Sequence, residues 1–201
     1  MNPLEPLQAS HIWRSHLDAL VRNVSDLLPQ KAQVLDVGCG DGRVAAEIVA
    51  SRPDITIQGL EVLLRQKSFI PVSQFDGRTL PEDDRSFDVV MFVDVLHHTD
   101  DPMPLLREAA RVTRHAVVVK DHLPEGFLAW QRLRLMDWIG NARFGVSLPY
   151  NYWSRERWLQ TFTTLELDRE RWIEAPFLFP WWANWFFGGS LHFLARLIRR
   201  R

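Results

Sequence analysis

Short apolar runs and longer amphipathic stretches alternate along this chain. The run Val89–Val93 is almost continuously apolar, as expected when helices cover both faces of a parallel sheet. The longer stretches repeat their apolar residues at helical spacing. The pattern predicts strands at 34–37, 55–60, 89–93, 115–120, 165–173 and 191–198, and helices at 11–28, 44–50, 102–112, 127–139 and 154–162. Strands that alternate with helices indicate an α/β fold.

The first predicted strand ends in a run of alternating glycines. The segment Val34–Arg43 reads V-L-D-V-G-C-G-D-G-R, and Gly38, Gly40 and Gly42 remove every second β-carbon where the chain has to turn. A helical pattern begins at Val44, so the unpaired N–H groups of that helix point at whatever lies above the glycines. This arrangement predicts a cradle for a nucleotide cofactor.

The charges around these glycines indicate which kind of cofactor binds. A dinucleotide-binding turn spaces its glycines G-x-G-x-x-G and seats a pyrophosphate on the helix N-terminus. Here the third glycine comes one residue early, and Asp36 and Asp41 place carboxylates within and beside the turn. Two carboxylates would repel a pyrophosphate, but they suit a ligand that carries an ammonium and a sulfonium.

The composition indicates the number of domains, the cellular compartment and the class of partner. With 201 residues the chain is about the size of one α/β domain, and its formal charge of -1 argues against a nucleic-acid partner. The single cysteine, Cys39, excludes an intrachain disulfide and is expected to be a small packing residue in a reducing compartment. No signal-peptide pattern is present, and no apolar run reaches the roughly 20 residues that span a bilayer. We therefore expect a cytoplasmic protein.

Two motifs resemble those of a known enzyme family. The residues D-V-G-C-G-D-G resemble motif I of the class I S-adenosylmethionine-dependent methyltransferases, and S-F-D-V-V with the later L-H-H and D-P resembles the signature of their small-molecule, type 11-like members. The resemblance implies a Rossmann-like, doubly wound sheet of seven strands in the order 3-2-1-4-5-7-6, with the last strand antiparallel. It also implies S-adenosyl-L-methionine as the cofactor.

The expected cofactor contacts follow the first four strands. Glu61 stands one βαβ step after Asp36, close to the spacing at which an acidic residue binds both ribose hydroxyls of a nucleotide. The segment 74–81 resembles the third-strand segment of the family, which implies that Asp76 binds the adenine amino group and that Gly77 allows close approach. The full predicted cofactor site is Asp36, Gly38, Cys39, Gly40, Asp41, Gly42, Glu61, Asp76, Gly77 and Asp94.

Two histidines are candidates for a catalytic base. Methylation of a hydroxyl requires removal of its proton, and an imidazole that titrates near neutrality suits this task. In L-H-H-T-D-D, His97 takes the place of the base in the L-H-D-W-S-D segment of plant-type O-methyltransferases, so the resemblance implies that role; a helix cap is the structural alternative. His122 follows the fifth predicted strand at the same sheet edge. Asp100 and Asp101 are predicted to be capping or turn residues.

Aromatic residues crowd the last part of the chain. Eight of the nine tryptophans lie at or after Trp130, and the run Pro176–Gly189 is the most apolar in the chain. Aromatic walls suit an apolar or aromatic acceptor, although each ring alone could simply pack against the sheet. The predicted acceptor wall consists of Trp130, Tyr150, Tyr152, Trp181 and Trp182, with Met136 nearby.

The segment 177–187 also suits a membrane surface. Its tryptophans and phenylalanines would dip into the interface as a peripheral contact, assisted by the C-terminal arginines Arg196, Arg199, Arg200 and Arg201. Both interpretations indicate a lipophilic acceptor.

A single domain of three parts is expected. Residues 1–29 form an N-terminal helical lid, begun by Ser10 as a helix cap, in which Trp13, Arg14 and His16 lie near the cofactor mouth. Residues 30–122 bind the cofactor, and residues 123–201 supply the substrate side with the last two strands.

The expected function is methyl transfer to a hydrophobic or aromatic small molecule, at oxygen first and at carbon second. The fourth strand ends in Asp94-Val95-Leu96-His97 and lacks the N/D-P-P-Y/F motif typical of enzymes that methylate nucleic-acid bases or glutamine. A protein methyltransferase and a non-catalytic cofactor-binding or docking subunit are the alternatives. The oligomeric state stays open.

Overall fold

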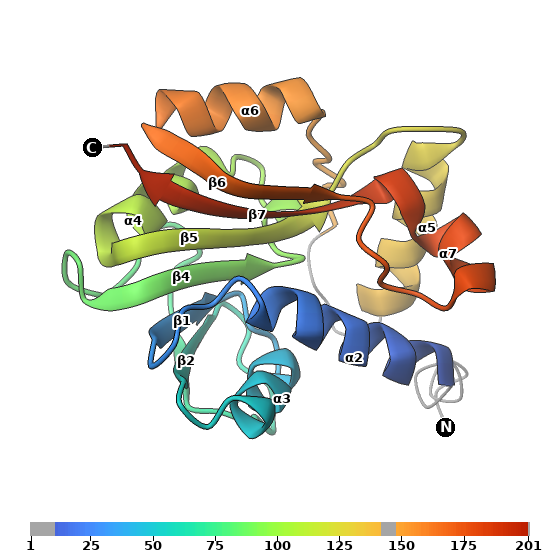
Figure 1. Ribbon diagram of the computed structural model, residues 1–201. Helices are drawn as coiled ribbons and strands as arrows, with labels where there is room; N and C mark the ends of the chain where they lie inside the picture. The colour runs from blue at the N-terminus through green and yellow to red at the C-terminus, as the bar shows by residue number, and fades with distance from the viewer. Residues whose placement is uncertain (1–10, 142–147, 201) are drawn as a thin grey trace.

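A computed structural model describes residues 11–141 and 148–200. In this part of the chain seven strands form one sheet in the order β3-β2-β1-β4-β5-β7-β6 (Figure 1). β7 lies between β5 and β6 and runs antiparallel to both, which confirms the expected topology. The strands are β1 (Gln33–Val37), β2 (Thr56–Glu61), β3 (Val72–Gln74), β4 (Phe87–Val93), β5 (Thr113–His122), β6 (Leu167–Glu174) and β7 (His192–Arg199).

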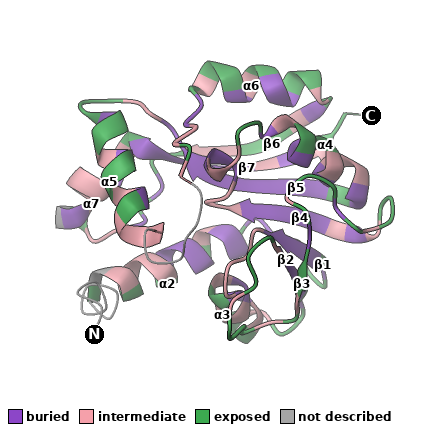
Figure 2. Ribbon diagram, turned by 180° about the vertical axis from the view of Figure 1, so that it is seen from behind, coloured by how far each residue is buried: buried purple, intermediate pink, exposed green. Residues whose placement is uncertain are grey.

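Helices cover both faces of the sheet. The helices are α2 (His11–Ser25), α3 (Arg43–Ser51), α4 (Met103–Val112), α5 (Ala129–Asn141), α6 (Arg155–Thr164) and α7 (Trp181–Phe187), with short 3-10 turns η1 (Leu96–His98) and η3 (Gly189–Leu191). Side chains of β4 alternate between the faces. Val90 and Phe92 join the core under α4 and α6, whereas Val89 and Met91 join the core under α2 and α3. The central strands are therefore buried on both sides, as Figure 2 shows.

Several element boundaries differ from the prediction. The first helix ends at Ser25 rather than Leu28, and its predicted cap, Ser10, lies outside the described residues. The third strand ends at Gln74, so Asp76 follows it in a loop. The aromatic segment 177–187, in which no helix was predicted, contains α7. The predicted cap Ser154 is confirmed, because its side chain accepts a hydrogen bond from Arg157 N–H.

The direction of β7 separates the C-terminal arginines from the aromatic segment. β7 begins beside α7 and η3 and ends at the opposite edge of the molecule (Figure 1). Arg196 and Arg200 form ion pairs with Glu170 and Asp168 of β6. The expectation that these arginines and α7 face one membrane surface is therefore wrong, and Arg201 lies outside the described residues. No helix in the described ranges is long and apolar enough to cross a membrane.

Candidate active site

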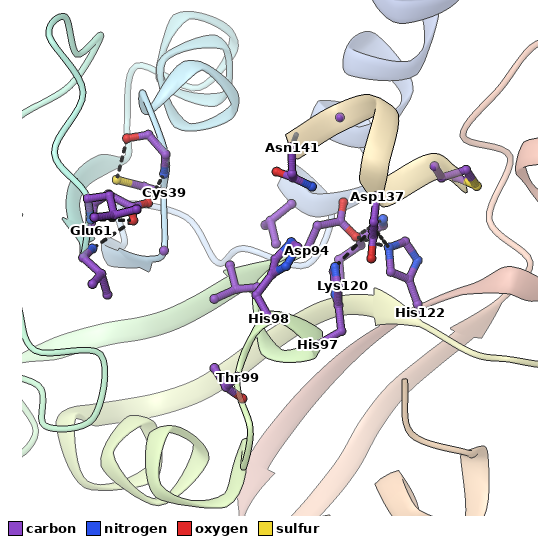
Figure 3. Close-up of a pocket in the computed structure, with 18 of the residues that line it drawn as sticks. Cys39, Glu61, Asp94, His97, His98, Thr99, Lys120, His122, Asp137 and Asn141 are labelled. Carbon is purple, nitrogen blue, oxygen red and sulfur yellow. Dashed lines mark hydrogen bonds and ion pairs between the residues drawn. The ribbon is translucent and has the colours of Figure 1, made fainter. Parts of the chain in front are cut away.

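A cavity of about 610 Å³ opens where β1, β2, β4 and β5 end. Its volume lies within the roughly 300–1,000 Å³ of small-ligand pockets, and the carboxyl edge is where open α/β sheets bind ligands. Figure 3 shows two ends: Cys39 and Glu61 lie at one, and the charged side chains around Asp137 lie at the other. The cavity can therefore hold two ligands side by side.

The glycine loop after β1 forms the first end. Gly38 and Gly40 have φ angles of 74° and 60°, which favour glycine. Gly38 N–H donates to Leu60 O at 2.7 Å, so the loop is anchored on β2. A Cβ added to Gly40 would meet no protein atom within 4 Å, because this position faces the open cavity. The loop thus fits a ligand that touches its backbone.

Glu61 ties the end of β2 to the glycine loop. One carboxylate oxygen accepts from Gly40 N–H at 2.7 Å, and the other accepts from Val62 N–H at 2.9 Å. Glu61 lines the cavity, as expected for the residue predicted to bind the ribose. The carboxylate lies at the same end of the cavity as the glycine loop, and its ribose contact stays a prediction.

The other carboxylates predicted near the cofactor lie outside the cavity lining. Asp36 is buried in β1, and burial, together with the charge of Glu61, raises its pKa to about 7. Asp41 and Gly42 lie further along the loop, where the Asp41 carboxylate accepts from Arg43. The carboxylates that line the cavity are those of Glu61, Asp94 and Asp137. The cofactor contacts of Asp36 and Asp41 therefore stay a prediction, because the Asp36 side chain is buried and the Asp41 carboxylate bonds to Arg43.

Asp76 and Gly77 also lie outside the cavity lining. The Asp76 carboxylate accepts from Arg78 N–H and Thr79 N–H, both at 2.7 Å, so it closes a turn. Gly77 has a φ of 79° within this turn. The neighbouring Phe75 lines the cavity in their place. The adenine contact of Asp76 remains a prediction.

Cys39 and helix α2 both border the cavity. Burial raises the pKa of the Cys39 thiol above its ordinary value, so the thiol stays protonated, and its Sγ packs where Gly59 leaves space. Trp13 and His16 of α2 line the cavity. His16 Nδ1 lies 3.1 Å from Leu178 O, and burial lowers the pKa of this ring to about 4. The neutral His16 therefore holds α2 across the cavity.

A buried ion pair joins the ends of β4 and β5. Lys120 is 1% exposed, and its ammonium pairs with Asp94, which has a left-handed φ of 57° directly after β4. Burial opposes ionisation of Asp94, but the Lys120 ammonium and nearby histidines hold its pKa well below the ordinary value. Asp94 lines the cavity, as its predicted cofactor role requires.

His97 forms a second buried pair, with Asp121. His97 Nδ1 lies 2.7 Å from Asp121 Oδ1, and the other carboxylate oxygen accepts from Leu96 N–H. Burial opposes the charged ring, but Asp121 and Asp137 raise the pKa of His97 to about 10. The ring already holds two protons at neutral pH. This geometry therefore argues against His97 as the catalytic base. It also argues against His97 as a helix cap, because Asp121 holds its ring.

Asp137 of α5 brings a third carboxylate to this end. Its Oδ1 lies 3.4 Å from His97 Nε2 and 3.6 Å from His122 Nε2, while Oδ2 accepts the hydroxyl hydrogen bond of Tyr152. Burial opposes ionisation of Asp137, but the two histidines hold its pKa far below the ordinary value. His98 lies beside it, and burial lowers the pKa of His98 to about 4.

His122 is linked to His192 of β7. Their Nδ1 atoms are 3.0 Å apart, and His192 Nε2 lies 2.7 Å from Phe187 O. A carbonyl only accepts, so the network assigns the His192 proton to Nε2 and makes His122 Nδ1 the donor. His122 Nε2 then faces Asp94 Oδ1 at 3.5 Å and Asp137 Oδ1 at 3.6 Å. This nitrogen is placed to take up a proton between two carboxylates.

The residues predicted to form the acceptor wall do not line the cavity in the part of the chain that the structure describes. Trp130 and Trp181 are 46% and 83% exposed, and Tyr150 and Tyr152 belong to a small cluster behind α5. None of these four lines the cavity, and the side chain of Trp182 is not among those that the structure describes. Helix α7 turns Trp181 outward, and Asp137 holds the Tyr152 hydroxyl. The apolar side chains that do line the acceptor end include Trp13, Met136 and Phe179.

Sequence reasoning missed several residues of the acceptor end. Asp137 lies in a helical run rich in tryptophan and leucine, and Lys120 ends the apolar strand A-V-V-V-K, so each is a charge in an apolar context that signals a buried partner. Asn141 and His192 also line the cavity, but no local sequence pattern marks either of them.

The predicted turn role of Asp101 is confirmed, because its carboxylate accepts a hydrogen bond from Met103 N–H.

The chain matches the model of a known family. Residues 10–171 match a family described as a methyltransferase domain. Because this match covers most of the chain, the chain belongs to that family, and its fold is that of the class I S-adenosylmethionine-dependent methyltransferases. S-adenosyl-L-methionine is the cofactor of this class.

Curated relatives and solved structures agree with this assignment. The chain is 31% identical over 110 residues to 27-O-demethylrifamycin SV methyltransferase of Amycolatopsis mediterranei, covering 47% of this chain and 40% of the relative. It is 30% identical over 139 residues to a phthiotriol/phenolphthiotriol dimycocerosates methyltransferase of Mycobacterium tuberculosis, covering 64% and 48%. The matches thus span about half the length of these relatives or less. A SAM-dependent methyltransferase from Thermotoga maritima has the same fold, with a TM-score of 0.66, 20% identity and 93% coverage of both chains.

Replacing Gly40 by valine is expected to weaken binding of S-adenosylhomocysteine about 10- to 100-fold, because the new side chain enters the cavity. Calorimetric titration measures this loss. The matched control is Gly189→Val. Gly189 has a similar φ of 65° and no close neighbour, but it lies outside the cavity lining. Equal affinity in the two variants would contradict the placement of the cofactor on this loop.

Replacing Asp36 by asparagine is expected to change how stability depends on pH. The folded chain holds the Asp36 proton more tightly than the unfolded chain, because the folded-state pKa is raised from 3.8 to about 7. The contribution of Asp36 to the free energy of unfolding therefore falls as the pH rises through this window, by at most about 4 kcal/mol. Asp36→Asn removes that loss. Urea unfolding at several pH values should show that the free energy of unfolding of the variant rises relative to that of the wild type as the pH approaches 7. A difference that does not change with pH would contradict the raised pKa of Asp36.

Proposed function

We propose that this chain methylates a hydroxyl oxygen of a lipophilic or aromatic small molecule, with a carbon acceptor as the second possibility. One observation supports this above the others: a single cavity joins the glycine loop and Glu61 to a buried cluster of histidines and carboxylates. The first end suits the cofactor. The second end offers a group that can take up the proton of a hydroxyl.

The residues at the cofactor end have a binding task. Gly38 and Gly40 present their backbone, and Glu61 presents a carboxylate at the same end of the cavity. When bound, S-adenosyl-L-methionine supplies a methyl group that is already activated as a sulfonium. The protein therefore mainly has to align the acceptor and keep water out. Trp13 and His16 of α2 also line the cavity and help to keep water out.

The acceptor end favours an apolar substrate with one polar group. Its walls include Trp13, Leu105, Met136 and Phe179, whereas its polar atoms are concentrated on the histidines and Asp137. The two relatives are named for 27-O-demethylrifamycin SV and for phthiotriol/phenolphthiotriol dimycocerosates, which supports a lipophilic small-molecule acceptor. The name of the first relative specifies an oxygen, 27-O, which supports an oxygen acceptor over a carbon acceptor.

His122 is the residue that we assign to proton uptake. Its Nε2 faces the cavity between Asp94 and Asp137, and both carboxylates would stabilise the imidazolium that forms. Methyl transfer to a hydroxyl would release its proton, and His122 Nε2 is the group that would accept it. His97 is already protonated and stays paired with Asp121.

Acceptor class is tested with radiolabelled S-adenosylmethionine and two cell fractions. Transfer of label to the lipid extract, and not to the protein extract, is the expected result. Label in protein would favour the protein-methyltransferase alternative instead. Tight binding of S-adenosylhomocysteine without transfer to either fraction would favour a docking subunit.

Replacing His122 by glutamine is expected to lower kcat by about 10²-fold or more without changing the affinity for S-adenosylhomocysteine. The reason is that the imidazole contributes to proton transfer and does not belong to the cofactor end. His115→Gln is the matched control, because His115 is exposed and lies beside Asp88, away from the cavity. A near-normal kcat in His122→Gln removes the residue from this role.

We further propose a peripheral membrane contact at the aromatic end of the molecule. Phe127, Phe177 and Trp181 are 83%, 76% and 83% exposed around α5 and α7, which Figure 1 shows side by side. Because the C-terminal arginines lie at the other edge, the contact depends on burial of these rings rather than on anionic lipid.

Vesicles of neutral phosphatidylcholine test this contact. The wild-type chain is expected to sediment with them, and a triple variant carrying Phe127→Ser, Phe177→Ser and Trp181→Ser is expected to stay in the supernatant. Arg200→Gln is the control at the opposite edge and should behave as wild type. Equal sedimentation of the triple variant and the wild type would contradict the proposal.

A further inference from the structure

Two buried nitrogen atoms at the acceptor end have no hydrogen-bond partner. Within residues 11–141 and 148–200, His97 Nε2 and His98 Nδ1 are both buried and make no hydrogen bond. Both histidines come from η1, directly after β4, and their ring centroids are 4.1 Å apart. His97 itself is only 1% exposed. Since buried polar atoms are nearly always paired in folded proteins, these two nitrogens indicate a missing ligand.

Asp137 supplies a third donor at the same point. One ligand atom each from His97, His98 and Asp137 lies within 4.8 Å of the other two. His97 Nε2 and Asp137 Oδ1 are 3.4 Å apart, which is long for a charge-assisted hydrogen bond. Two ligands about 2.0–2.1 Å from one tetrahedral ion are separated by about 3.3 Å. The observed distance therefore fits two ligands of a shared metal ion.

In two of these side chains, the polar atom that would not bind the ion already has a hydrogen-bond partner. His97 Nδ1 lies 2.7 Å from Asp121, and Asp137 Oδ2 accepts from Tyr152. A carboxylate on the far nitrogen of a metal-binding histidine is the usual orienting partner, because it fixes the ring and raises its basicity. The side chains around the site therefore resemble the support that metal ligands require.

The local charge balance also favours a cation. Asp94, Asp121 and Asp137 bring three carboxylates to this part of the molecule, and the Lys120 ammonium is taken by Asp94 (Figure 3). Asp121 and Asp137 are left to share the one positive charge of His97, each beside a different ring nitrogen. A divalent ion beside Asp137 would replace this proton and supply the positive charge that two buried carboxylates need.

A neighbouring set of donor atoms is less suitable for a metal ion. Asp94, His122 and His192 also lie within reach of one another. However, Lys120 already pairs with Asp94, the two histidines bond to each other, and His192 bonds to Phe187 O. An ion there would have to displace an ammonium and break two hydrogen bonds.

We propose that His97 Nε2, His98 Nδ1 and Asp137 Oδ1 bind a divalent transition-metal ion of the zinc type, with its remaining position open to the cavity. Three protein ligands with one open position is the pattern of catalytic rather than structural zinc sites. All three residues line the cavity. If the proposed function holds, on which this role rests, the ion would bind the acceptor oxygen and favour loss of its proton.

Metal binding is tested on the full chain without a histidine tag, after treatment with a chelator. Calorimetric titration with Zn²⁺ should show one ion per chain, and Co²⁺ should give the visible absorption of a tetrahedral site. His98→Gln and Asp137→Asn are expected to lower the Zn²⁺ affinity by about 100-fold or more, and Asp121→Asn by about 10- to 100-fold. His115→Gln is the matched control and should bind as wild type does. Thermal unfolding without metal shows that each variant is folded.

Three results would overturn this inference: no stoichiometric binding to the wild type, equal affinity in His98→Gln and wild type, or loss of the ion in His192→Gln but not in His98→Gln. Titration of the metal-free chain with S-adenosylhomocysteine separates this inference from the proposed function. If the cofactor product binds and Zn²⁺ does not, only the metal site fails. If the cofactor product does not bind, the proposed function fails whatever the metal result.

Discussion

The pairing of buried charges at the carboxyl edge of the sheet is the constraint on which the acceptor end depends. Asp94 follows β4, Asp121 lies at the end of β5, and Asp137 projects from α5. An unpaired carboxylate in such a place would cost several kcal/mol. Lys120 and His97 meet this need from neighbouring positions of the same edge. The result is a rigid polar floor in an otherwise apolar part of the molecule.

The same charges connect elements that the sheet alone does not hold. Asp137 bonds to Tyr152 and faces His97 and His122, so α5 is tied to β4 and β5 through side chains. Arg132 of α5 donates to Phe186 O of α7, which joins the two aromatic helices. The acceptor side is thus fixed by polar contacts, whereas the cofactor side is fixed by the backbone of the glycine loop and by Glu61.

The two ends of the cavity differ in how they depend on the rest of the fold. The glycine loop and Glu61 need only two adjacent parallel strands, because Gly38 N–H bonds to β2 and Gly40 N–H bonds to Glu61. The acceptor end needs β7 as well. Antiparallel insertion of β7 beside β5 brings His192 next to His122, and it places α7 over the same edge. Variation in the late elements can therefore change the acceptor while the cofactor end is kept.

The order of the strands was implied by the resemblance to the family. The sequence pattern itself indicated six of the seven strands, the glycine loop and Glu61. These features depend on local properties, namely apolar periodicity, glycine spacing and the length of one βαβ step. It also indicated His122 at the sheet edge, because a residue at the end of a parallel strand has a predictable place.

Only the tertiary structure decided which side chains meet at the acceptor end. The prediction placed Tyr152 and Trp181 in the wall, but Asp137 holds the first behind α5, and α7 turns the second outward. His97 was predicted to be a base, but Asp121 and Asp137, from two other elements, raise its pKa to about 10. Such outcomes depend on distances between residues that are far apart in the chain, and no local pattern in the sequence encodes those distances.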